Sequence, residues 1–148
     1  MIHKVRHLVS RFIEMGRPVV SEVDDDRFAA ERLSAAELRL WRMMDPRDRR
    51  HSVEVTKRFV VAFPGATRAE VAGVLLHDVG KAATKLGRCG RAIATILPLT
   101  RAMIIYRDHE RLGGRMLAEI GSEHRTIELV DGSCNDEVAR ALRDADDA

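Results

Sequence analysis

The sequence contains few residues of several types, and each shortage excludes some classes of protein. Its two cysteines, Cys89 and Cys134, form no Cys-x-x-Cys pair and no disulfide framework, which favours a reducing cytoplasm. Aromatic residues make up only 4% of the chain, so few side chains can stack on the bases of single-stranded nucleic acid. The net charge of +2 is too small to predict binding to nucleic acid. We therefore expect a cytoplasmic protein that does not bind long nucleic acids.

The sequence also lacks an apolar run long enough to cross a membrane. Its longest apolar stretch, residues 92–105, is too short for a bilayer and is interrupted by Pro98 and Arg101. Residues 1–15 intersperse basic side chains among apolar ones with a helical period, unlike the uninterrupted apolar core of a signal peptide. This segment predicts an amphipathic helix that packs on its own domain, and we expect no membrane association.

What the chain does contain favours helices. Ala, Leu, Arg and Glu dominate the composition, and no segment alternates polar and apolar residues over a useful length. Helix starts are indicated by capping boxes at Ser34–Glu37 and Thr67–Glu70 and by an N-cap and proline at Asp45-Pro46. The 148 residues predict one all-α bundle, with a helical extension and linker over residues 1–44 and the core over residues 45–148.

Glycines, prolines and charge runs predict the limits of the remaining elements. The acidic run at residues 21–26 predicts a solvated linker. Gly80 is expected to end the helix that follows Thr67. The expected helical segments of the second half are residues 88–97 and 99–106, joined at a proline, one from Asp108 to Gly121, one from Ser122, and one from about Asn135.

The stretch Leu75-Leu76-His77-Asp78-Val79-Gly80-Lys81 carries the most chemistry. It places an imidazole beside a carboxylate at the end of an apolar helix pattern, where each buried polar group needs a partner. A neutral imidazole nitrogen and a carboxylate oxygen are both ligands for divalent first-row metals. Taken alone, the pair is better explained as a hydrogen-bonded core histidine and a polar aspartate in the last helical turn.

Helical phase brings further polar side chains to apolar helix faces. In the helix predicted after Pro46, His51 shares one face with the apolar residues Val55, Phe59 and Ala62. In the last helix, Asp146 lies within roughly 40° of the inward Leu142, whereas Asp144 falls nearly opposite. The residues on the stripe of His109 are Leu112, Gly113 and Met116. A cation would let a small bundle bury these groups, and nitrogen and oxygen ligands without a thiolate suit Mn, Fe, Co, Ni or Mg.

In order and neighbourhood, His51, the His77-Asp78 pair and Asp146 resemble the H…HD…D signature of the HD-domain metal-dependent phosphohydrolases. The resemblance covers the chain from about Asp45 to its end. It implies an all-α HD-type fold in which these four residues bind a divalent metal ion. Lys81 matches the family's lysine after the glycine, which implies a contact with a substrate phosphate.

The sequence departs from the fuller pattern of that family at one place. Many members carry a further histidine where this chain has Asp131-Gly132-Ser133, and the tyrosine-bearing motif of the branch that cleaves cyclic dinucleotides is absent. We therefore expect one metal ion per chain rather than two.

Phosphoester cleavage suggests a role for each candidate residue. Asp78 is expected to bind the metal and to orient the attacking water. Lys81, together with Arg88 or Arg91, is expected to neutralise charge on the substrate phosphate. His109 is a candidate general acid for the leaving oxygen. The expected substrate is a nucleotide or a similar small phosphorylated metabolite, and the chain can be a monomer or a homodimer.

Two other function classes remain open. One is a degenerate HD module that binds metal and nucleotide as a sensor without turnover, since a fold and a motif do not guarantee catalysis. The other is a structural helical domain that docks on a partner or a membrane through its basic N-terminal helix. Metal analysis separates the two, because the structural domain needs no cation.

Overall fold

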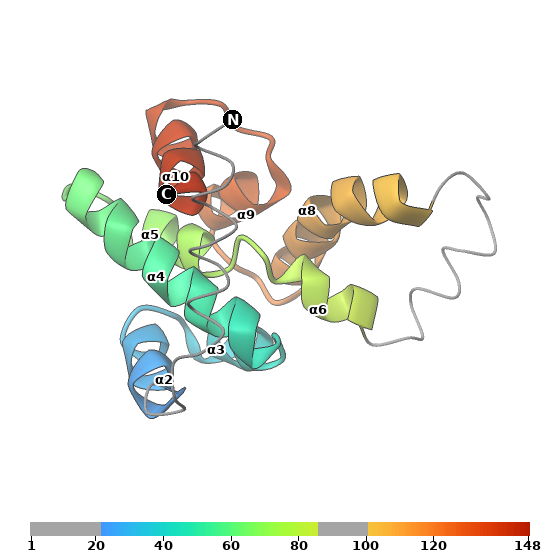
Figure 1. The fold of residues 1–148 in the computed structure, drawn as a ribbon, viewed down its shortest axis with the longest axis horizontal. Helices are drawn as coiled ribbons and strands as arrows, with labels where there is room; N and C mark the ends of the chain where they lie inside the picture. The colour runs from blue at the N-terminus through green and yellow to red at the C-terminus, as the bar shows by residue number, and fades with distance from the viewer. Residues whose placement is uncertain (1–21, 86–100) are drawn as a thin grey trace.

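The computed structural model describes residues 22–85 and 101–148, and this part of the chain consists of helices and turns without a strand (Figure 1). This confirms the all-α prediction. The helices are α2 (Glu22–Ala30), α3 (Ala35–Arg42), α4 (Pro46–Ala62), α5 (Arg68–Leu75), α6 (Gly80–Lys85), α8 (Arg101–Glu119), α9 (His124–Asp131) and α10 (Glu137–Asp147). Across the described ranges, no helix is long and apolar enough to cross a membrane.

Three helix starts lie where the capping signals predict them. Ser34 and Thr67 each accept a hydrogen bond from the backbone N–H three residues later, and the glutamate at that position bonds back to the cap. Asp45 accepts from the N–H of Arg47, with a proline at the first position of α4. These signals succeed because both partners of each bond lie within one helical turn.

The expected acidic linker is instead a helix. Glu22, Asp24 and Asp25 occupy the first turn of α2, where carboxylates are stabilised by the positive end of the helix dipole. The run also docks on the rest of the bundle, because Asp26 accepts two hydrogen bonds of 2.7 Å from the guanidinium of Arg42. The prediction of a linker was wrong because it counted the charges and not their position at a helix start.

Two boundaries in the middle of the chain also differ from expectation. Helix α5 ends at Leu75, and Gly80 begins α6 instead of ending the preceding helix. Helix α8 runs through Asp108 without a break, so this aspartate starts no helix. An aspartate inside a helix costs only about 0.7 kcal/mol, which neighbouring helix formers readily outweigh.

The later boundaries are closer to expectation. Gly121 and Gly132 follow α8 and α9 with φ of 76° and 72°, the left-handed conformation that ends helices. Helix α9 begins after Ser122, and α10 begins after Asn135, with Asp136 as the N-cap. The expected N-terminal helix, Arg88, Arg91 and the segment around Pro98 lie outside the described residues.

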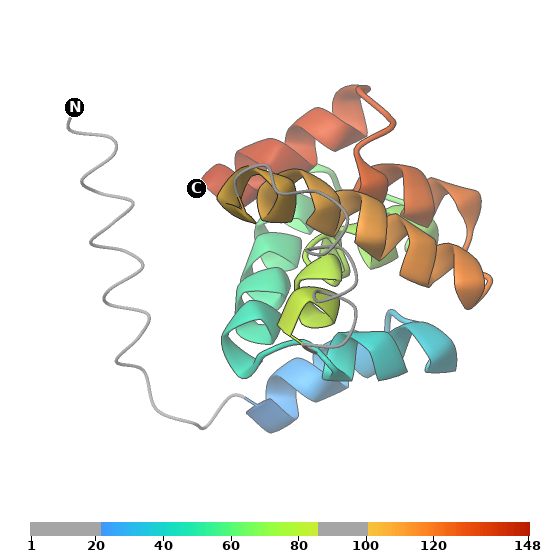
Figure 2. The same ribbon diagram turned by 90° about the vertical axis from the view of Figure 1, so that its right-hand side faces the viewer.

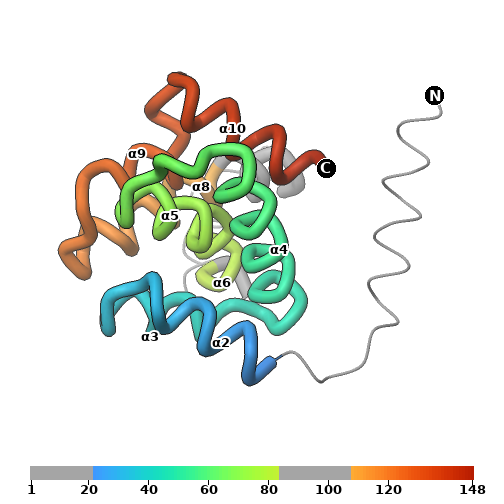
Figure 3. Tube along the Cα trace, turned by 90° about the vertical axis from the view of Figure 1, so that its left-hand side faces the viewer, coloured from blue at the N-terminus to red at the C-terminus, as the bar shows by residue number. Residues whose placement is uncertain are grey.

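Two clusters of buried apolar side chains form the core. The first includes Trp41, Leu75, Leu76, Val79 and Leu117, and the second includes Val55, Phe59, Val74, Leu129 and Leu142. Helix α5 contributes to both clusters, because it packs between α4 and α9. Helices α2 and α3 cover one end of the bundle and α10 the opposite end, with α4 extending between them (Figures 2 and 3). Side chains from α4, α8 and α10 lie beside the turn that follows α5.

Candidate metal centre

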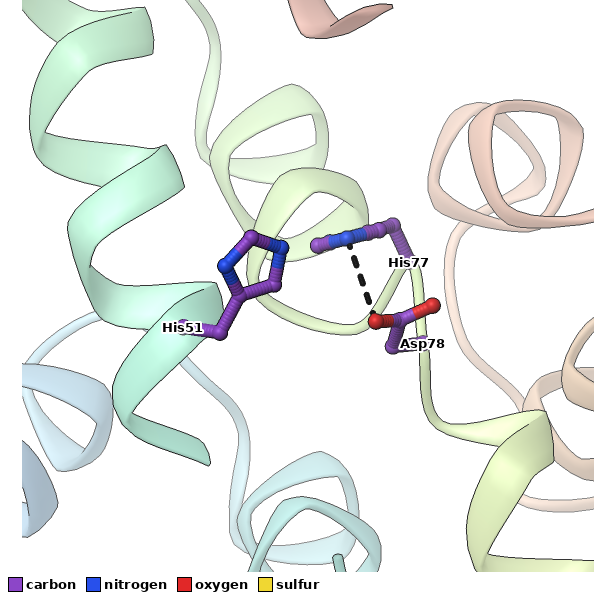
Figure 4. A group of neighbouring side chains, drawn as sticks. All are labelled: His51, His77 and Asp78. Carbon is purple, nitrogen blue, oxygen red and sulfur yellow. Dashed lines mark ion pairs between the residues drawn. The ribbon is translucent and has the colours of Figure 1, made fainter. Parts of the chain in front are cut away.

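The centre is organised around the turn that connects α5 to α6. Leu76 and Val79 are completely buried in the core, and the N–H of Val79 donates to the carbonyl of Leu76 at 2.9 Å. These two apolar anchors flank His77 and Asp78, whose side chains lie on the same side of the turn (Figure 4). The sequence predicts that the pair lies at the end of a helix. In the structure the pair lies instead in the turn that follows α5.

The turn is held tightly against α8. A Cβ placed on Gly80 would lie 1.7 Å from the carbonyl oxygen of His109, which no side chain can occupy. Glycine is required here by the close approach of a neighbouring backbone, and its φ is not positive. This contact also brings the His109 ring to the turn, with its Nε2 3.9 Å from Oδ1 of Asp78.

Helix α4 brings His51 to the centre. Val55 and Phe59, on the same stripe, are completely buried, whereas Ala62 is exposed because the helix ends there. The His51 ring meets the ring of His77 edge-on, with centroids 5.8 Å apart. Ligand atoms of His51, His77 and Asp78 all lie within 4.8 Å of one another, which identifies the three as a candidate metal-binding group.

Helix α10 supplies Asp146 from the far end of the sequence. Its Oδ1 is 2.7 Å from Nε2 of His51, across 95 residues of chain. Asp144 is exposed, in agreement with its opposite phase on the helix. Asp146 is not part of the three-residue group, but its Oδ1 also lies 3.6 Å from Nε2 of His77. The four residues predicted as ligands thus lie together, and their role as ligands stays a prediction.

The ring of His77 has one nitrogen engaged and one without a hydrogen bond. Its Nδ1 lies 2.8 Å from the carbonyl oxygen of Val74, which can only accept, so Nδ1 carries a proton. In the neutral ring Nε2 therefore holds a lone pair. This Nε2 is buried, makes no hydrogen bond, and lies 3.6 Å from Oδ2 of Asp78 and from Oδ1 of Asp146. A lone pair facing two carboxylate oxygens is unfavourable, so the arrangement calls for a positive charge there, either a proton on Nε2 or a cation between the groups.

The pKa values of these groups agree with that requirement. Burial alone would lower the pKa of His77, but the carboxylates of Asp146 and Asp78 outweigh it and raise this pKa. Burial opposes ionisation of Asp78, yet His77 and Lys81 hold its pKa below the ordinary value. Contacts with His51 and His77 hold the pKa of Asp146 far below its usual range. The surroundings thus favour two ionised carboxylates and a positive charge among them, which a protonated His77 or a bound cation can supply.

Lys81 and His109 lie on either side of Asp78. The ammonium of Lys81 donates to Oδ2 of Asp78 at 2.6 Å, and its side chain is 41% exposed. The side chain of His109 is only 10% exposed. The remaining predicted phosphate contacts, Arg88 and Arg91, lie outside the described residues.

One residue beside the centre escaped the sequence analysis. The Nε of Arg58 donates to the carbonyl oxygen of Ala145 at 2.8 Å, directly before Asp146 in the chain. Arg58 follows His51 by about two helical turns, which places both on one side of α4. That spacing is the signal from which its position could have been anticipated.

Comparisons of the chain with models of protein families, with curated proteins and with solved structures found no match. The interpretation of the centre therefore depends on its own geometry and chemistry.

Proposed function

We propose that His51, His77, Asp78 and Asp146 hold one divalent cation, and that the chain is a metal-dependent phosphohydrolase. The observation that carries the proposal is the buried Nε2 of His77, which makes no hydrogen bond and lies 3.6 Å from an oxygen of each of two carboxylates. A cation in the middle of these donors would accept the lone pair and neutralise both carboxylates. The resemblance to the HD-domain phosphohydrolases supports the same four ligands.

The donor set fits such an ion. Two neutral imidazoles and two carboxylates provide nitrogen and oxygen ligands without a thiolate, which suits Mn, Fe, Co, Ni or Mg. The hydrogen bond from His77 Nδ1 to the carbonyl of Val74 fixes the tautomer that leaves Nε2 available. Bound there, a divalent ion supplies a Lewis acid for a phosphoryl oxygen and a water of lowered pKa.

The exposure of the side chains supports one side of approach for a substrate. The side chains of His77 and Asp78 are 12% and 7% exposed, whereas those of Asp146 and Lys81 are 39% and 41% exposed. We therefore expect a small phosphorylated molecule to approach from the side on which Asp146 and Lys81 are exposed. Its phosphate would gain a charge-assisted hydrogen bond from that ammonium, and Arg88 and Arg91 remain proposed as further contacts.

The protein side chains also provide groups for proton transfer. Asp78 would orient the attacking water through the carboxylate that faces the centre. His109 has its Nε2 3.9 Å from Oδ1 of Asp78 and is nearly buried, so we assign it as the candidate general acid for the leaving oxygen. The substrate that we propose is a nucleotide or a similar small phosphorylated metabolite.

A second function is favoured by the ion pair between Lys81 and Asp78. An ammonium held 2.6 Å from Asp78 is already neutralising that carboxylate, and it has less capacity to bind a phosphate. A module that binds a metal and a nucleotide without cleaving it, as a sensor, would keep this pair. Tight nucleotide binding with no phosphate release under any of the five metals would favour the sensor.

The test begins with the metal itself. The purified chain is stripped with a chelator, loaded in turn with Mn, Fe, Co, Ni or Mg, and assayed for phosphate release from a panel of nucleotides. We expect release to depend on the added metal, to disappear in Asp78→Ala, and to persist in Asp144→Ala, whose side chain is exposed. Equal turnover by Asp78→Ala and the unmodified chain, or the absence of any bound cation, would contradict the proposal.

A further inference from the structure

The last turn of α10, which carries Asp146, has an unfavourable distribution of charge. Three aspartates, Asp144, Asp146 and Asp147, stand in this turn, and no basic residue of the helix accompanies them. The carboxyl end of a helix already bears partial negative charge, and its last four carbonyl groups have no partner within the helix. A donor from another element would therefore stabilise this turn.

Arg58 of α4 is such a donor. Its Nε donates to the carbonyl oxygen of Ala145 at 2.8 Å, across 87 residues of chain. Ala145 is buried in the second apolar cluster, so its carbonyl has a defined position for the guanidinium to hold. The positive charge of Arg58 also opposes the negative end of the helix dipole. Helix α4 thus forms two polar contacts with the end of α10. Arg58 bonds the backbone of Ala145, and His51 bonds the side chain of Asp146.

We propose that Arg58 is a positioning residue for Asp146, an inference that rests on the metal-binding function proposed above. Asp146 is 39% exposed, so packing alone does not fix its carboxylate. The hydrogen bond to the carbonyl of the preceding residue fixes the backbone from which that carboxylate extends toward His51 and His77. Without Arg58 the turn loosens, and the fourth ligand is lost from its place although its own side chain is unchanged.

The experiment measures the dissociation constant of Mn²⁺ by titration calorimetry for the full chain and its variants. We expect Arg58→Gln to weaken binding about 10-fold, because residues that orient a ligand typically contribute 10- to 100-fold to metal affinity. Lys57→Gln is the matched control, since Lys57 is the adjacent residue of α4 and its exposed ammonium pairs with Glu54. It should leave the affinity unchanged. Arg58→Lys retains the charge and a donor, and should recover part of the loss.

A double-mutant cycle tests whether Arg58 acts through Asp146. In the Asp146→Ala background, adding Arg58→Gln should produce no further loss of Mn²⁺ affinity, because the ligand that Arg58 positions is already absent. Amide hydrogen exchange in the last turn of α10 gives a readout that does not involve metal. Exchange there should accelerate in Arg58→Gln and stay unchanged in Lys57→Gln.

The outcomes separate this inference from the proposed function. If the unmodified chain binds none of Mn²⁺, Fe²⁺, Co²⁺, Ni²⁺ and Mg²⁺, both are overturned, and if it binds another of these ions but not Mn²⁺, the same titrations are made with that ion. If it binds Mn²⁺ and Arg58→Gln binds equally well, the metal site stands and the role of Arg58 is refuted. An undiminished effect of Arg58→Gln in the Asp146→Ala background refutes that role too. Should Arg58→Gln fail to fold, Arg58→Lys replaces it in the same cycle, and an affinity equal to that of the unmodified chain counts against the proposal.

Discussion

Glu37 and Asp78 are both buried carboxylates, and a comparison of their surroundings shows two ways of burying a charge. Oε2 of Glu37 accepts from the N–H of Ser34 at 2.8 Å and from the guanidinium of Arg68 at 2.9 Å. Asp78 accepts from Lys81, but it also lies beside the unbonded Nε2 of His77. Glu37 is surrounded by donors that satisfy it, whereas beside Asp78 the buried Nε2 of His77 makes no hydrogen bond.

The difference has a physical meaning. A buried acceptor that meets a donor stabilises the fold, as in the capping box of Glu37. An excess of acceptors destabilises the fold unless a cation joins them. Hydrogen bonds to donors therefore explain Glu37, whereas the His77-Asp78 group needs a proton on His77 or a cation beside it. This contrast is the main reason to treat the second group as a binding centre.

The largest expected effect is at Gly80, which holds the turn that carries His77 and Asp78 against α8. Adding a methyl group there would force the turn away from α8, because a Cβ would lie 1.7 Å from the carbonyl oxygen of His109. We expect Gly80→Ala to lower the free energy of unfolding by about 3 kcal/mol, measured by urea denaturation. Gly65→Ala is the control, since nothing lies within 4 Å of a Cβ at that position, and it should stay within about 0.5 kcal/mol of the unmodified chain. Equal losses of unfolding free energy in the two variants would show that the close contact between Gly80 and His109 does not stabilise the fold.

A second test exchanges the two carboxylates for amides and measures metal affinity. Asp78→Asn should weaken Mn²⁺ binding by about 100-fold, on the order of 2.7 kcal/mol, because it removes a charged ligand. Glu37→Gln should leave the affinity unchanged, although it also removes a buried charge. Circular dichroism verifies that both variants remain helical. A similar loss in the two variants would mean that metal affinity reports general stability and not the His77-Asp78 group.

The smallest expected effect is the pH dependence of stability at Glu37. Burial alone would raise the pKa of Glu37, but the N–H of Ser34 and the guanidinium of Arg68 outweigh it and lower this pKa. The ionised form therefore stabilises the folded state above the ordinary pKa of glutamate, and this contribution is lost as the pH falls through the lowered pKa. Glu37→Gln should cost about 1 kcal/mol at pH 7.

The unfolding free energies of the two proteins should converge as the solution is acidified, measured by urea denaturation across pH. Glu54→Gln is the control, because Glu54 forms an exposed pair with Lys57 and should contribute less than about 0.5 kcal/mol at any pH. A gap between Glu37→Gln and the unmodified chain that is constant with pH would show that shape, and not charge, is responsible.

What the sequence predicts well is local. The capping boxes at Ser34 and Thr67 depend on atoms three residues apart, and the inward phase of Asp146 depends only on the helical period. Each can be deduced without knowledge of the neighbouring elements. Helical phase predicts that Asp146 faces inward. It does not predict that Asp146 lies beside His51, because that contact depends on how α4 and α10 pack.

What the sequence predicts poorly is decided by contacts between distant segments. Gly80 resembles a helix stop, and its actual role is to admit the backbone of α8. Asp108 resembles an N-cap, yet α8 continues through it. Arg58 has no local signal except its spacing from His51, because its partner is a carbonyl group 87 residues away. Packing between elements overrides local preference at each of these positions.

The proposed ligands come from α4, from the turn after α5 and from α10, with 95 residues between His51 and Asp146. An unfolded chain cannot gather donors so far apart, so a cation would bind the native state and have little affinity for the unfolded one. By mass action, each tenfold excess of free metal over its dissociation constant would then add about 1.4 kcal/mol to the free energy of unfolding. The stability of this bundle would thereby report the concentration of metal around it.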